Sequence, residues 1–562
     1  MRRRLTATAV LLAAGLLSAA CSAGAGGSNG GSGGSSGGTA KATSVVTISN
    51  ENGALWTCGF SPFNGSDTLL SVGFVYEPLV FINPLQNGKT TPMLATSWKW
   101  GAGNKSIAFT IRKGVKFNDG SPMSPSDVVF TFNLLKKFPA LDLGGVWSVL
   151  SSVSQTGADQ VTMTFKAPAV PDFYYIADQT PIVPAKIWSK IANPVSFSNP
   201  KPVGTGPFEV NPCTKQNITY TANPHYWQPG LPKIKKVQYP AFTSNNTAND
   251  QLANGQAQWG SQYIPGIKSF YTDKSPNFHY WFPPTVSVSL VPNLKNPLLA
   301  NVKVRQAMSY AIDRAKVSQI GESGYEPPAN QAGIVTPTFT SWLNKPALAK
   351  FGKAFDPAKA KQLLAQAGYK LGSDGIMANA QGKKLSFSVI NIGDYSDWVA
   401  SMQVITQNLK AVGIQLTPDN LTNTSFDADL YNGKYELAYY DQQTFGPSPY
   451  YELRNWLDSA GTAPIGKIAA TNYERYSNPA TDKLFSQYSS STSAAQQHAI
   501  INQVQEVMLN EVPIIPVVSA VDWFQYDTTN LTGWPTPGNP YSQPSAYAYP
   551  DMEQVLLHLR SK

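Results

Sequence analysis

Histidine and cysteine, the side chains that most often bind metals or act as nucleophiles, are scarce in this sequence. The chain has only four histidines, His225, His279, His498 and His558, and none is spaced from another as a pair of ligands. A zinc or nickel site needs several nitrogen or sulfur ligands brought together. The sequence therefore predicts no bound metal and no cofactor.

Motifs for catalysis find little support. There is no His-Glu-x-x-His sequence, and the Gly-x-Ser-x-Gly match at 33–37 lies in a Gly- and Ser-rich stretch, without the strand and helix that flank a nucleophile elbow. The 34 acidic residues offer many carboxylate pairs that suit glycoside hydrolysis, so a secreted hydrolase stays open as a remote alternative. No Gly-x-x-x-x-Gly-Lys-Ser/Thr loop occurs, so an ATP-driven step requires another chain.

The beginning of the chain has the order of a bacterial secretory signal. Three arginines precede an apolar run from Ala7 to Leu17, which is too short to span a bilayer, and small residues lead to Cys21. The stretch 17–21 resembles a lipobox. We therefore expect residues 1–21 to be a lipoprotein signal peptide with a lipid on Cys21, and ordinary secretion after cleavage near Ala20 is the alternative.

Residues 22–44 begin with a stretch rich in Gly and Ser, a composition that behaves as a flexible coil. We interpret it as a tether between a lipid anchor and a folded body on the extracytoplasmic face of the cell membrane. In such an oxidising compartment the two remaining cysteines, Cys58 and Cys213, form a disulfide candidate, although they also suit two independent buried thiols.

Composition indicates a large folded protein that does not bind nucleic acid. The 562 residues correspond to three or four domain-sized units, with 42% hydrophobic and 14% charged residues. The formal net charge is +9, but no block of lysine and arginine occurs, so electrostatic support for nucleic-acid binding is weak. The 13 Trp, 26 Tyr and 25 Phe residues are numerous, which suits both cores and ligand clefts.

Strand and helix patterns alternate irregularly after the tether, which favours a mixed α/β protein with more than one lobe. Strands are predicted at 45–48 and 107–111, and a helix begins at Ser124–Asp127, where Pro and Asp suit the first turn. Further helices are predicted at 304–317, 357–367, 397–412 and 494–510. The final fifty residues are rich in Pro, Tyr and Gly and are expected to form short strands only.

An ordered series of motifs then resembles the family 5 extracellular solute-binding proteins, the dipeptide-, oligopeptide- and nickel-binding receptors of ABC importers. The densest match reads TPMLATSWKW and AFTIRKGVKFNDGSPMSPSDVVFTFNLL, within 91–135. Further matches follow in order along the chain at Tyr76–Leu79, Val203–Phe208, Asn223–Trp227, Val302–Arg314, Asp356–Gly368 and Glu511–Pro516. Most of these residues are expected to support the scaffold, with Gly114, Gly120, Gly204 and Gly206 in turns or close backbone contacts.

The resemblance implies an α/β, two-lobe periplasmic-binding-protein-like fold that closes by a hinge around its ligand. Lobe I would comprise 45–280, with an inserted subdomain at about 71–200, and again 513–562, while lobe II would comprise 281–512. The hinge crossings are expected near Trp281–Pro284 and Pro513–Val518. The closed monomer would deliver its solute to an ABC permease with separate ATPase subunits, and it would not be an enzyme.

The resemblance also directs attention to Leu437–Tyr450 as a wall of the cleft. In peptide-binding members an acidic residue in this segment pairs with the α-ammonium group of the peptide. The aligned position holds Gln443, so Asp441 substitutes only if the loop is shifted. Gln442 and Gln443 offer neutral amides, which suit hydroxyl groups as well as peptide groups.

Aromatic side chains complete the predicted ligand-binding residues. Tyr439, Tyr440, Trp259 and Trp56 are candidates for stacking on a sugar ring or on a peptide side chain, and packing between lobes is the alternative for Trp259 and Tyr440. We predict a peptide or peptide-like solute, with an oligosaccharide as the alternative ligand and nickel as a less favoured one. A surface adhesin or signalling receptor without transport stays open as a third class.

Overall fold

The computed structural model describes residues 45–50, 55–242, 244–442 and 445–562. These residues belong to one of the two units into which the chain divides, Ala42–Lys562, and only this unit is considered below. The predicted signal peptide, the lipid on Cys21, the tether and the side chain of Gln443 lie outside the described residues.

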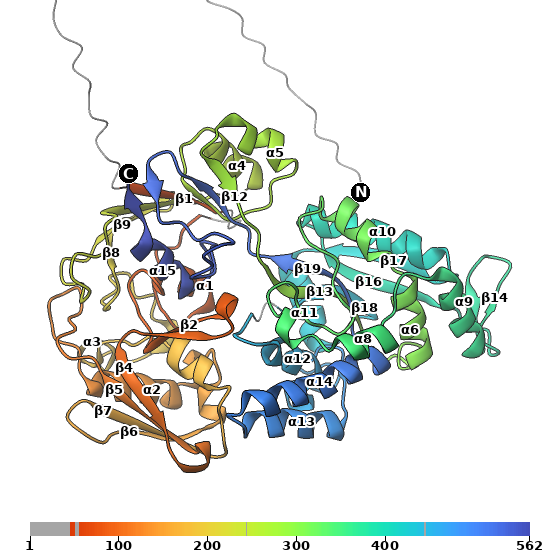
Figure 1. Cartoon of the computed structure of the whole chain (residues 1–562), viewed down its shortest axis with the longest axis horizontal. Coiled ribbons are helices and arrows are strands. Elements are labelled where there is room, and N and C mark those ends of the chain that lie inside the picture. The colour runs from red at the N-terminus through yellow and green to blue at the C-terminus, as the bar shows by residue number, and fades with distance from the viewer. Residues whose placement is uncertain (1–44, 51–54, 243, 443–444) are drawn as a thin grey trace, which may run out of the picture. The chain divides into compact units, whose positions relative to one another are not determined.

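A seven-stranded mixed sheet gathers strands from both ends of the unit (Figure 1). Its first strand, β1, pairs in parallel with β10 on one side and with β11 on the other, so residues far apart in sequence meet at its centre. In spatial order the strands are β12 (Phe278–Tyr280), β20 (Gln525–Asp527), β11 (Trp259–Gly260), β1 (Val45–Ser49), β10 (Lys236–Pro240), β9 (Asn217–Ala222) and β8 (Phe208–Cys213).

A five-stranded sheet forms the second framework. In spatial order its strands are β17 (Gln415–Leu421), β16 (Ser386–Ile392), β18 (Leu437–Asp441), β13 (Pro284–Pro292) and β19 (Ile515–Val521). Most side chains of β13 and β18 are buried, and such strands require cover on both faces. Helices α10 (Ser396–Lys410) and α11 (Asn423–Asn432) supply it, because Trp398 of α10 packs on Tyr439 and Phe426 of α11 packs on Tyr440.

A four-stranded antiparallel sheet and three two-stranded sheets complete the strands. The four-stranded sheet has the order β4 (Ala95–Trp100), β5 (Ser106–Ile111), β7 (Gln160–Phe165) and β6 (Leu150–Gln155). The pairs are β2 (Val80–Asn83) with β3 (Lys89–Pro92), β14 (Lys370–Leu371) with β15 (Met377–Ala378), and β21 (Leu531–Thr532) with β22 (Arg560–Ser561).

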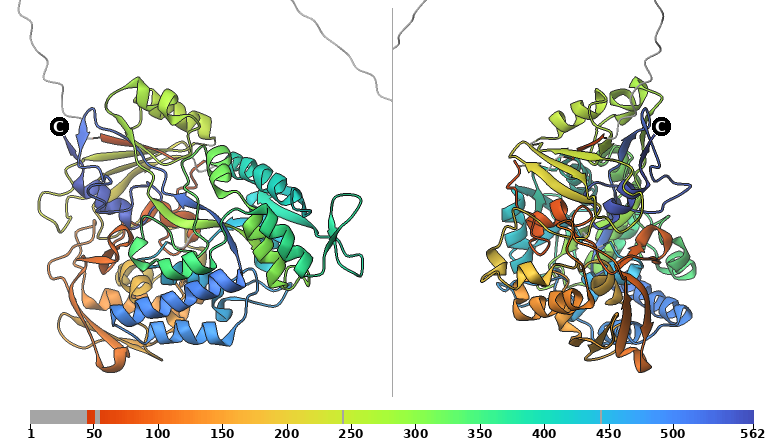
Figure 2. Two further views of the ribbon diagram at one scale, coloured as in Figure 1. Left: turned by 45° about the vertical axis from the view of Figure 1, so that its right-hand side comes forward. Right: turned by 90° about the vertical axis from the view of Figure 1, so that its left-hand side faces the viewer.

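The remaining helices pack around these sheets, and α13 and α14 lie side by side in both figures (Figures 1 and 2). Those before residue 300 are α1 (Gly65–Ser71), α2 (Pro125–Lys137), α3 (Ala185–Trp188), α4 (Asn245–Ala253) and α5 (Ile267–Phe270). Those after it are α6 (Val302–Ala311), α7 (Arg314–Lys316), α8 (Lys345–Phe351), α9 (Pro357–Gln366), α12 (Pro449–Leu457), α13 (Pro479–Ser489), α14 (Ala494–Glu511) and α15 (Asp551–His558). Within the described part of the chain, every helix is too short or too polar to cross a lipid bilayer.

The chain passes twice between the seven-stranded and five-stranded sheets. The first passage is 281–283, between β12 and β13, which agrees with the expected crossing near Trp281–Pro284. The second is 522–524, between β19 and β20. It lies just beyond the expected Pro513–Val518, because β19 stays paired with β13 as far as Val521.

Two glycines allow a close backbone approach that the family motif predicted. A Cβ atom on Gly204 would lie 2.0 Å from the carbonyl oxygen of Val75, and one on Gly206 would lie 2.5 Å from that of Phe74. The backbone N–H of Gly206 donates to Val75 O at 2.8 Å. Any larger residue would push these two segments apart, so the motif supports the scaffold.

Two predicted elements differ from the structure. The helix expected at 304–317 is broken, because Ile312 is extended and Asp313 begins a new turn by accepting a hydrogen bond from the Lys316 backbone N–H. The final fifty residues contain a helix, α15, which was not expected. Seven of its eight residues are buried, acids included, so it lacks the polar stripe by which an amphipathic helix is recognised.

Candidate ligand-binding site

The described residues enclose a cavity of about 1460 Å³ between the two large sheets and the four-stranded region. Its lining includes Thr68 on α1, Tyr174 after the four-stranded sheet, Gln262 after β11, Trp398 on α10 and Val521 at the end of β19. Both passages between the sheets therefore border the cavity or lie next to it. A site of this size, formed where separate parts of a fold meet, is typical of ligand pockets.

The described lining is rich in acids and aromatic rings and contains no Lys or Arg. Its aromatic residues are Phe63, Tyr174, Tyr175, Tyr263, Tyr395, Trp398, Phe445, Trp523, Tyr547 and Tyr549. Its acidic residues are Asp142, Glu326, Asp394, Asp397, Asp441 and Asp522. Rings provide apolar contact area, while the carboxyl groups give the site a negative character.

Four carboxyl groups form an acidic cluster on the side of the five-stranded sheet. Asp441 ends β18, Asp397 lies in the first turn of α10, and Glu322 and Glu326 follow the π-helical turn Val317–Gly321. Asp397 benefits from the partial positive charge of a helix N-terminus. Three members line the cavity, while Glu322 lies behind them and accepts a hydrogen bond from Ser401 Oγ.

Burial and mutual repulsion make this cluster reluctant to ionise. Burial, together with the nearby carboxylate of Asp397, raises the pKa of Glu322 to about 8. Burial also raises the pKa of Glu326 well above its ordinary value, and the charges of Glu322, Asp397 and Asp441 add to the effect. The pKa of Asp397 is raised by burial, against backbone N–H groups that favour its charge. A positively charged ligand would reverse these shifts.

Asp522 is a second buried acid, in the passage between β19 and β20. Burial and the neighbouring charge of Asp551 raise its pKa to about 8, and Gln543 Nε2 donates to its Oδ2 at 3.4 Å. Tyr547 is close enough to both Asp522 and Glu326 for each to raise its pKa. The two acids therefore border the same region of the cavity.

Rings from both passages cluster beside Asp522. Trp523 contacts Phe282, Tyr263 and Tyr325, with centroid distances of 4.9, 5.4 and 6.1 Å. Trp523 and Tyr263 line the cavity, and Phe282 lies in the first passage. On the opposite side, Trp398 packs edge-on against Tyr439 at 5.4 Å. Aromatic surface therefore borders both acidic regions.

The predicted side chains of β18 point alternately to the two faces of the five-stranded sheet. Asp441 lines the cavity, and Tyr439, on the same face, is fully buried beneath Trp398. Tyr440 points to the other face, where it packs on Phe426 and Tyr473. Gln442 is also buried and does not line the cavity; its Nε2 donates to Asn455 O at 3.4 Å.

The predicted tryptophans lie in the core of the seven-stranded sheet. Trp259 is 0% exposed, its Nε1 donates to Pro544 O at 2.8 Å, and its ring packs edge-on against Trp534. Trp56 is 7% exposed and its Nε1 donates to Tyr239 O at 2.8 Å. Neither lines the cavity. Stacking of either ring on a ligand therefore finds no support in this arrangement, since their faces and N–H groups are already used.

Sequence reasoning passed over several residues that line the cavity. Glu326, Asp522, Trp523, Tyr263 and Trp398 line the cavity and are not among the residues that the sequence predicts to bind ligand. These side chains reach the cavity only because the assembled sheets bring the segments that carry them together. Trp523 had one usable signal, because it follows the strand that ends at Val521 in the expected region of return between lobes.

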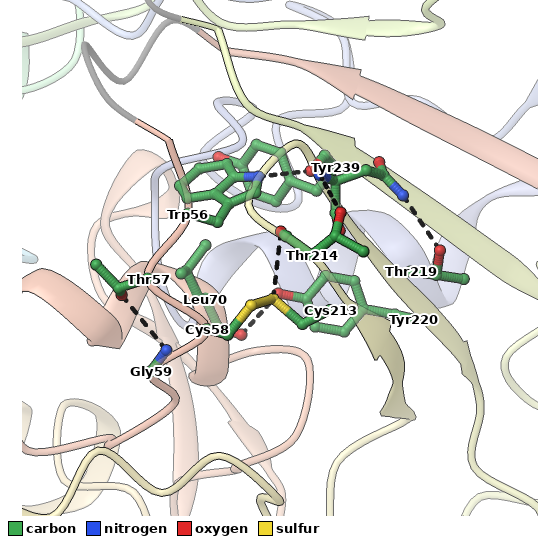
Figure 3. The surroundings of a disulfide bond; sticks show 11 residues. Trp56, Thr57, Cys58, Gly59, Leu70, Cys213, Thr214, Thr219, Tyr220 and Tyr239 are labelled. Atoms are coloured by element: carbon green, nitrogen blue, oxygen red, sulfur yellow. Dashed lines mark hydrogen bonds between the residues drawn. A yellow bond between two sulfur atoms is a disulfide. The ribbon is translucent and has the colours of Figure 1, made fainter.

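A disulfide joins Cys58 to Cys213, 155 residues apart in sequence (Figure 3). It connects the segment before α1 to the end of β8, next to Trp56 and Tyr239. Tyr220 OH donates to Leu70 O at 2.8 Å in the same region. The disulfide that the sequence suggested is thus present in the structure, and it holds one edge of the seven-stranded sheet.

Among the described residues, no group of three or more His, Cys, Asp or Glu is arranged to hold a metal ion.

The two sheets, the passages between them and the lined cavity define a solute-binding protein that encloses its ligand between lobes. The sequence profile of the bacterial extracellular solute-binding proteins, family 5 Middle, matches residues 89–464. The chain belongs to this family of solute-binding proteins.

Similar proteins come from several bacteria. The glutathione-binding protein GsiB of Escherichia coli K12 is 25% identical over 503 residues, 86% of this chain and 90% of that protein. A periplasmic oligopeptide-binding protein of Thermotoga maritima has a solved structure that is 26% identical, covers 92% of this chain and 99% of that one, and superposes with a TM-score of 0.85. A mannohexaose-bound structure from the same organism, described as an oligopeptide-binding protein, is 25% identical with a TM-score of 0.80 and covers 93% of this chain and 100% of that one.

Proposed function

We propose that this chain is the extracytoplasmic receptor of an ABC importer and that it captures a peptide or peptide-like solute in the cavity between its lobes. The acidic cavity carries this proposal. A peptide presents an α-ammonium group, which needs a carboxylate partner once it leaves water. Glu326, Asp397 and Asp441 offer that partner, and the described lining has no competing Lys or Arg.

The lobes proposed to close on the solute are 45–280 with 513–562, and 281–512, with a subdomain at about 71–200 inserted in the first. Contacts across the cavity support this division. Tyr174 OH donates to Phe445 O at 3.1 Å, and Tyr451 OH donates to Pro171 O at 2.7 Å. Bonds of this kind form only when the lobes meet, so a ligand that adds contacts in the closed state shifts the population toward it.

Delivery would follow from closure. The closed receptor would dock as a monomer on a membrane permease, and separate ATPase subunits would supply the energy. The chain itself would carry out no reaction. We also propose that Cys21 carries a lipid and that residues 22–44 tether the receptor to the cell membrane, because the order of charged, apolar and small residues suits a lipoprotein signal. A Cys21→Ser variant should appear in the culture fluid or periplasm instead of the membrane fraction.

An oligosaccharide is the second candidate solute, and the ten aromatic residues of the lining favour it. Sugar rings pack on aromatic faces, and amides such as that of Gln262 suit hydroxyl groups. The mannohexaose-bound relative from Thermotoga maritima is an example on a similar fold. The peptide candidate is favoured over it, because the hydroxyl groups of a neutral sugar can donate hydrogen bonds to the buried acids but supply no positive charge to compensate theirs.

Ligand-dependent stabilisation of the purified protein tests the proposal. Native mass spectrometry would identify any co-purified solute, and a thermal-shift panel would compare di- to hexapeptides with cello-, xylo- and malto-oligosaccharides. A ligand at 100 times its Kd stabilises the folded state by about 2.7 kcal/mol, which raises Tm by several degrees. Stabilisation by peptides is expected. Stabilisation by sugars alone would replace the peptide proposal, and turnover of any panel member would contradict the non-enzymatic role.

A further inference from the structure

The charge balance of the cavity narrows the class of solute that it suits. Six acids line it, and the described lining contains no Lys or Arg. Arg454 interacts with Asp172 and Asp458, and neither of these acids lines the cavity. A free α-carboxylate of a solute would therefore find no ion-pair partner in the described lining of this cavity.

The surroundings of Glu326 favour a ligand that carries a cationic group. Glu326 is only 3% exposed and lines the cavity. Its Oε2 atom has no hydrogen-bond partner among the described residues. A buried polar atom without a partner is costly. An ammonium or guanidinium group in the cavity would donate to this oxygen and neutralise the repulsion from Asp397 and Asp441 at the same time.

Asp522 supplies a second place for positive charge. It is 5% exposed and directly follows β19, whose last residue, Val521, donates a backbone hydrogen bond to the Glu326 side chain, so Asp522 is a separate carboxyl group next to Glu326. Its described partner is the side-chain amide of Gln543, which leaves its charge without a cation. Rings of Trp523 and Tyr263 stand next to it and offer cation–π contacts to the same group.

We propose that the cavity selects solutes with at least two positive charges and no carboxylate within the enclosed part, such as the amino-terminal portion of a basic peptide or a polyamine-like cation. This inference rests on the proposed function and narrows its ligand. One positive group is held by Glu326 with Asp397 and Asp441, and another by Asp522. An anionic tripeptide such as glutathione, with two carboxylates and one ammonium group, is rejected by the same acids.

Calorimetric titration with matched tripeptides at neutral pH tests the inference. The probes are Lys-Ala-Ala-NH2, with two positive charges, Gln-Ala-Ala-NH2, with one, and Glu-Ala-Ala-NH2, with one positive and one negative charge. Lys-Ala-Ala with a free carboxylate and glutathione complete the set. The dicationic amide is expected to bind at least about tenfold more tightly than each of the others. Equal affinity for all, or preference for the acidic peptide, would overturn the inference while leaving a peptide receptor intact.

Variants connect that preference to the named acids. Glu326→Gln is expected to lower the affinity for the dicationic peptide by about tenfold or more. The affinity for the Gln-containing peptide should change less, because the substitution removes a charge and keeps the shape of the side chain. Asp522→Asn supplies an independent second test if Glu326→Gln fails to fold. The matched control is Glu506→Gln, the same change on an exposed face of α14 outside the cavity. Unchanged charge preference in both cavity variants would contradict the inference, and binding of sugars alone would contradict the proposed function itself.

Discussion

Among single residues, burial decides which of the predicted side chains border the cavity. Asp441 ends a strand at the cavity, while Tyr440, one residue earlier, points into the packing around Phe426. Alternation along a strand produces this division. Trp259 is buried in the same way, by the assembly of β11 with β1 and β20.

Binding of a cationic solute should strengthen as pH rises. Glu326 faces Glu322, Asp397 and Asp441, as well as the hydroxyl groups of Tyr439 and Tyr547, and the pKa of Glu322 is raised to about 8. Raised pKa values leave these carboxyl groups partly protonated near neutral pH, whereas a cation binds their ionised form, so binding releases protons.

Titration calorimetry at pH 6 and pH 8, in buffers of different ionisation enthalpy, measures this effect. Tighter binding at the higher pH, with proton release, is expected. An affinity independent of pH would show that the acidic cluster does not contact the charged group. The exposed Glu506→Gln variant should keep the wild-type pH dependence.

The tryptophans offer a direct comparison of a core role with a ligand role. Trp259→Leu should lower the free energy of unfolding by about 3 kcal/mol or more, since it removes a fully buried ring and a hydrogen bond. Trp523→Leu, at the cavity, should weaken ligand binding and cost less stability. Denaturant unfolding and calorimetry of both variants separate the two effects. Loss of affinity without loss of stability in Trp259→Leu would instead support the prediction that this residue contacts the ligand.

Among the elements, two arginines on either side of the break after α6 connect the helices to the five-stranded sheet. The turn begun by Asp313 directs Arg314 into the core, where its Nε donates to Pro516 O at 2.7 Å and its Nη1 to Ser309 O at 3.1 Å. Arg305 on α6 donates to Val512 O at 2.8 Å. The family motif at Val302–Arg314 therefore joins helices to β19 and to the segment that leads into it.

Arg314→Ala should act on stability and leave ligand affinity nearly unchanged. Its loss leaves Pro516 O and Ser309 Oγ without this donor, and buried hydrogen bonds to charged groups contribute about 1.5–3 kcal/mol each. Chemical denaturation should show the loss. Gln306→Ala serves as a control. The side chain of Gln306 donates one described hydrogen bond, to Asn510 O, and this bond is exposed, so its loss should change stability much less. Intact stability with lost binding in Arg314→Ala would contradict the scaffold role.

The disulfide should stabilise the edge of the seven-stranded sheet. Because it closes a loop of 155 residues, replacing both cysteines by serine should lower the free energy of unfolding by about 2–5 kcal/mol. Unfolding of the double variant, compared with wild type with and without reductant, measures the difference. The reduced wild type should approach the variant, and equal stability of all three would rule out a structural role for the bond.

At the scale of the whole molecule, buried acids outnumber buried bases, and this imbalance ties stability to pH. Burial raises the pKa of Asp551 and of Glu452 to about 7, and the pKa of Asp522 to about 8. Unfolding returns these groups to water, where their pKa values are near 4. Between those limits the unfolded chain holds fewer protons than the folded protein, so stability falls as pH rises.

The Tm of the ligand-free protein should therefore fall by several degrees between pH 6 and pH 8.5, because each unit of pKa shift corresponds to about 1.4 kcal/mol at full effect. Asp551→Asn should reduce the dependence of Tm on pH, because an amide does not titrate in this range. The amide oxygen can still accept the hydrogen bond from Gln543 N, so the local structure is retained. Scanning calorimetry across this range measures both. A Tm that rises over the same interval would contradict the assignment, and a bound cation should reduce the fall.

Local patterns determined much of the scaffold. The strand at 45–48, the strand at 107–111 and the start of α2 at Ser124, where the backbone N–H of Ser124 donates to Asp127 Oδ2 at 2.9 Å, follow from alternation and from the chemistry of a helix N-terminus. The α/β class and the family motifs could be recognised for the same reason, since turns, caps and close glycine contacts depend on neighbours in sequence.

The lining of the cavity depends on tertiary packing. Glu326, Asp397, Asp441 and Asp522 come from four separate segments, and they border one cavity only after the two sheets assemble with the chain passages between them. Sequence patterns could not indicate that Trp259 is enclosed while Trp523 faces the cavity, or that α15 is buried on nearly all sides. The class of this protein and its local elements could be recognised from the sequence, because they depend on short-range geometry. The charge of its cavity required the tertiary structure, because only long-range packing brings the acids together and excludes water from them.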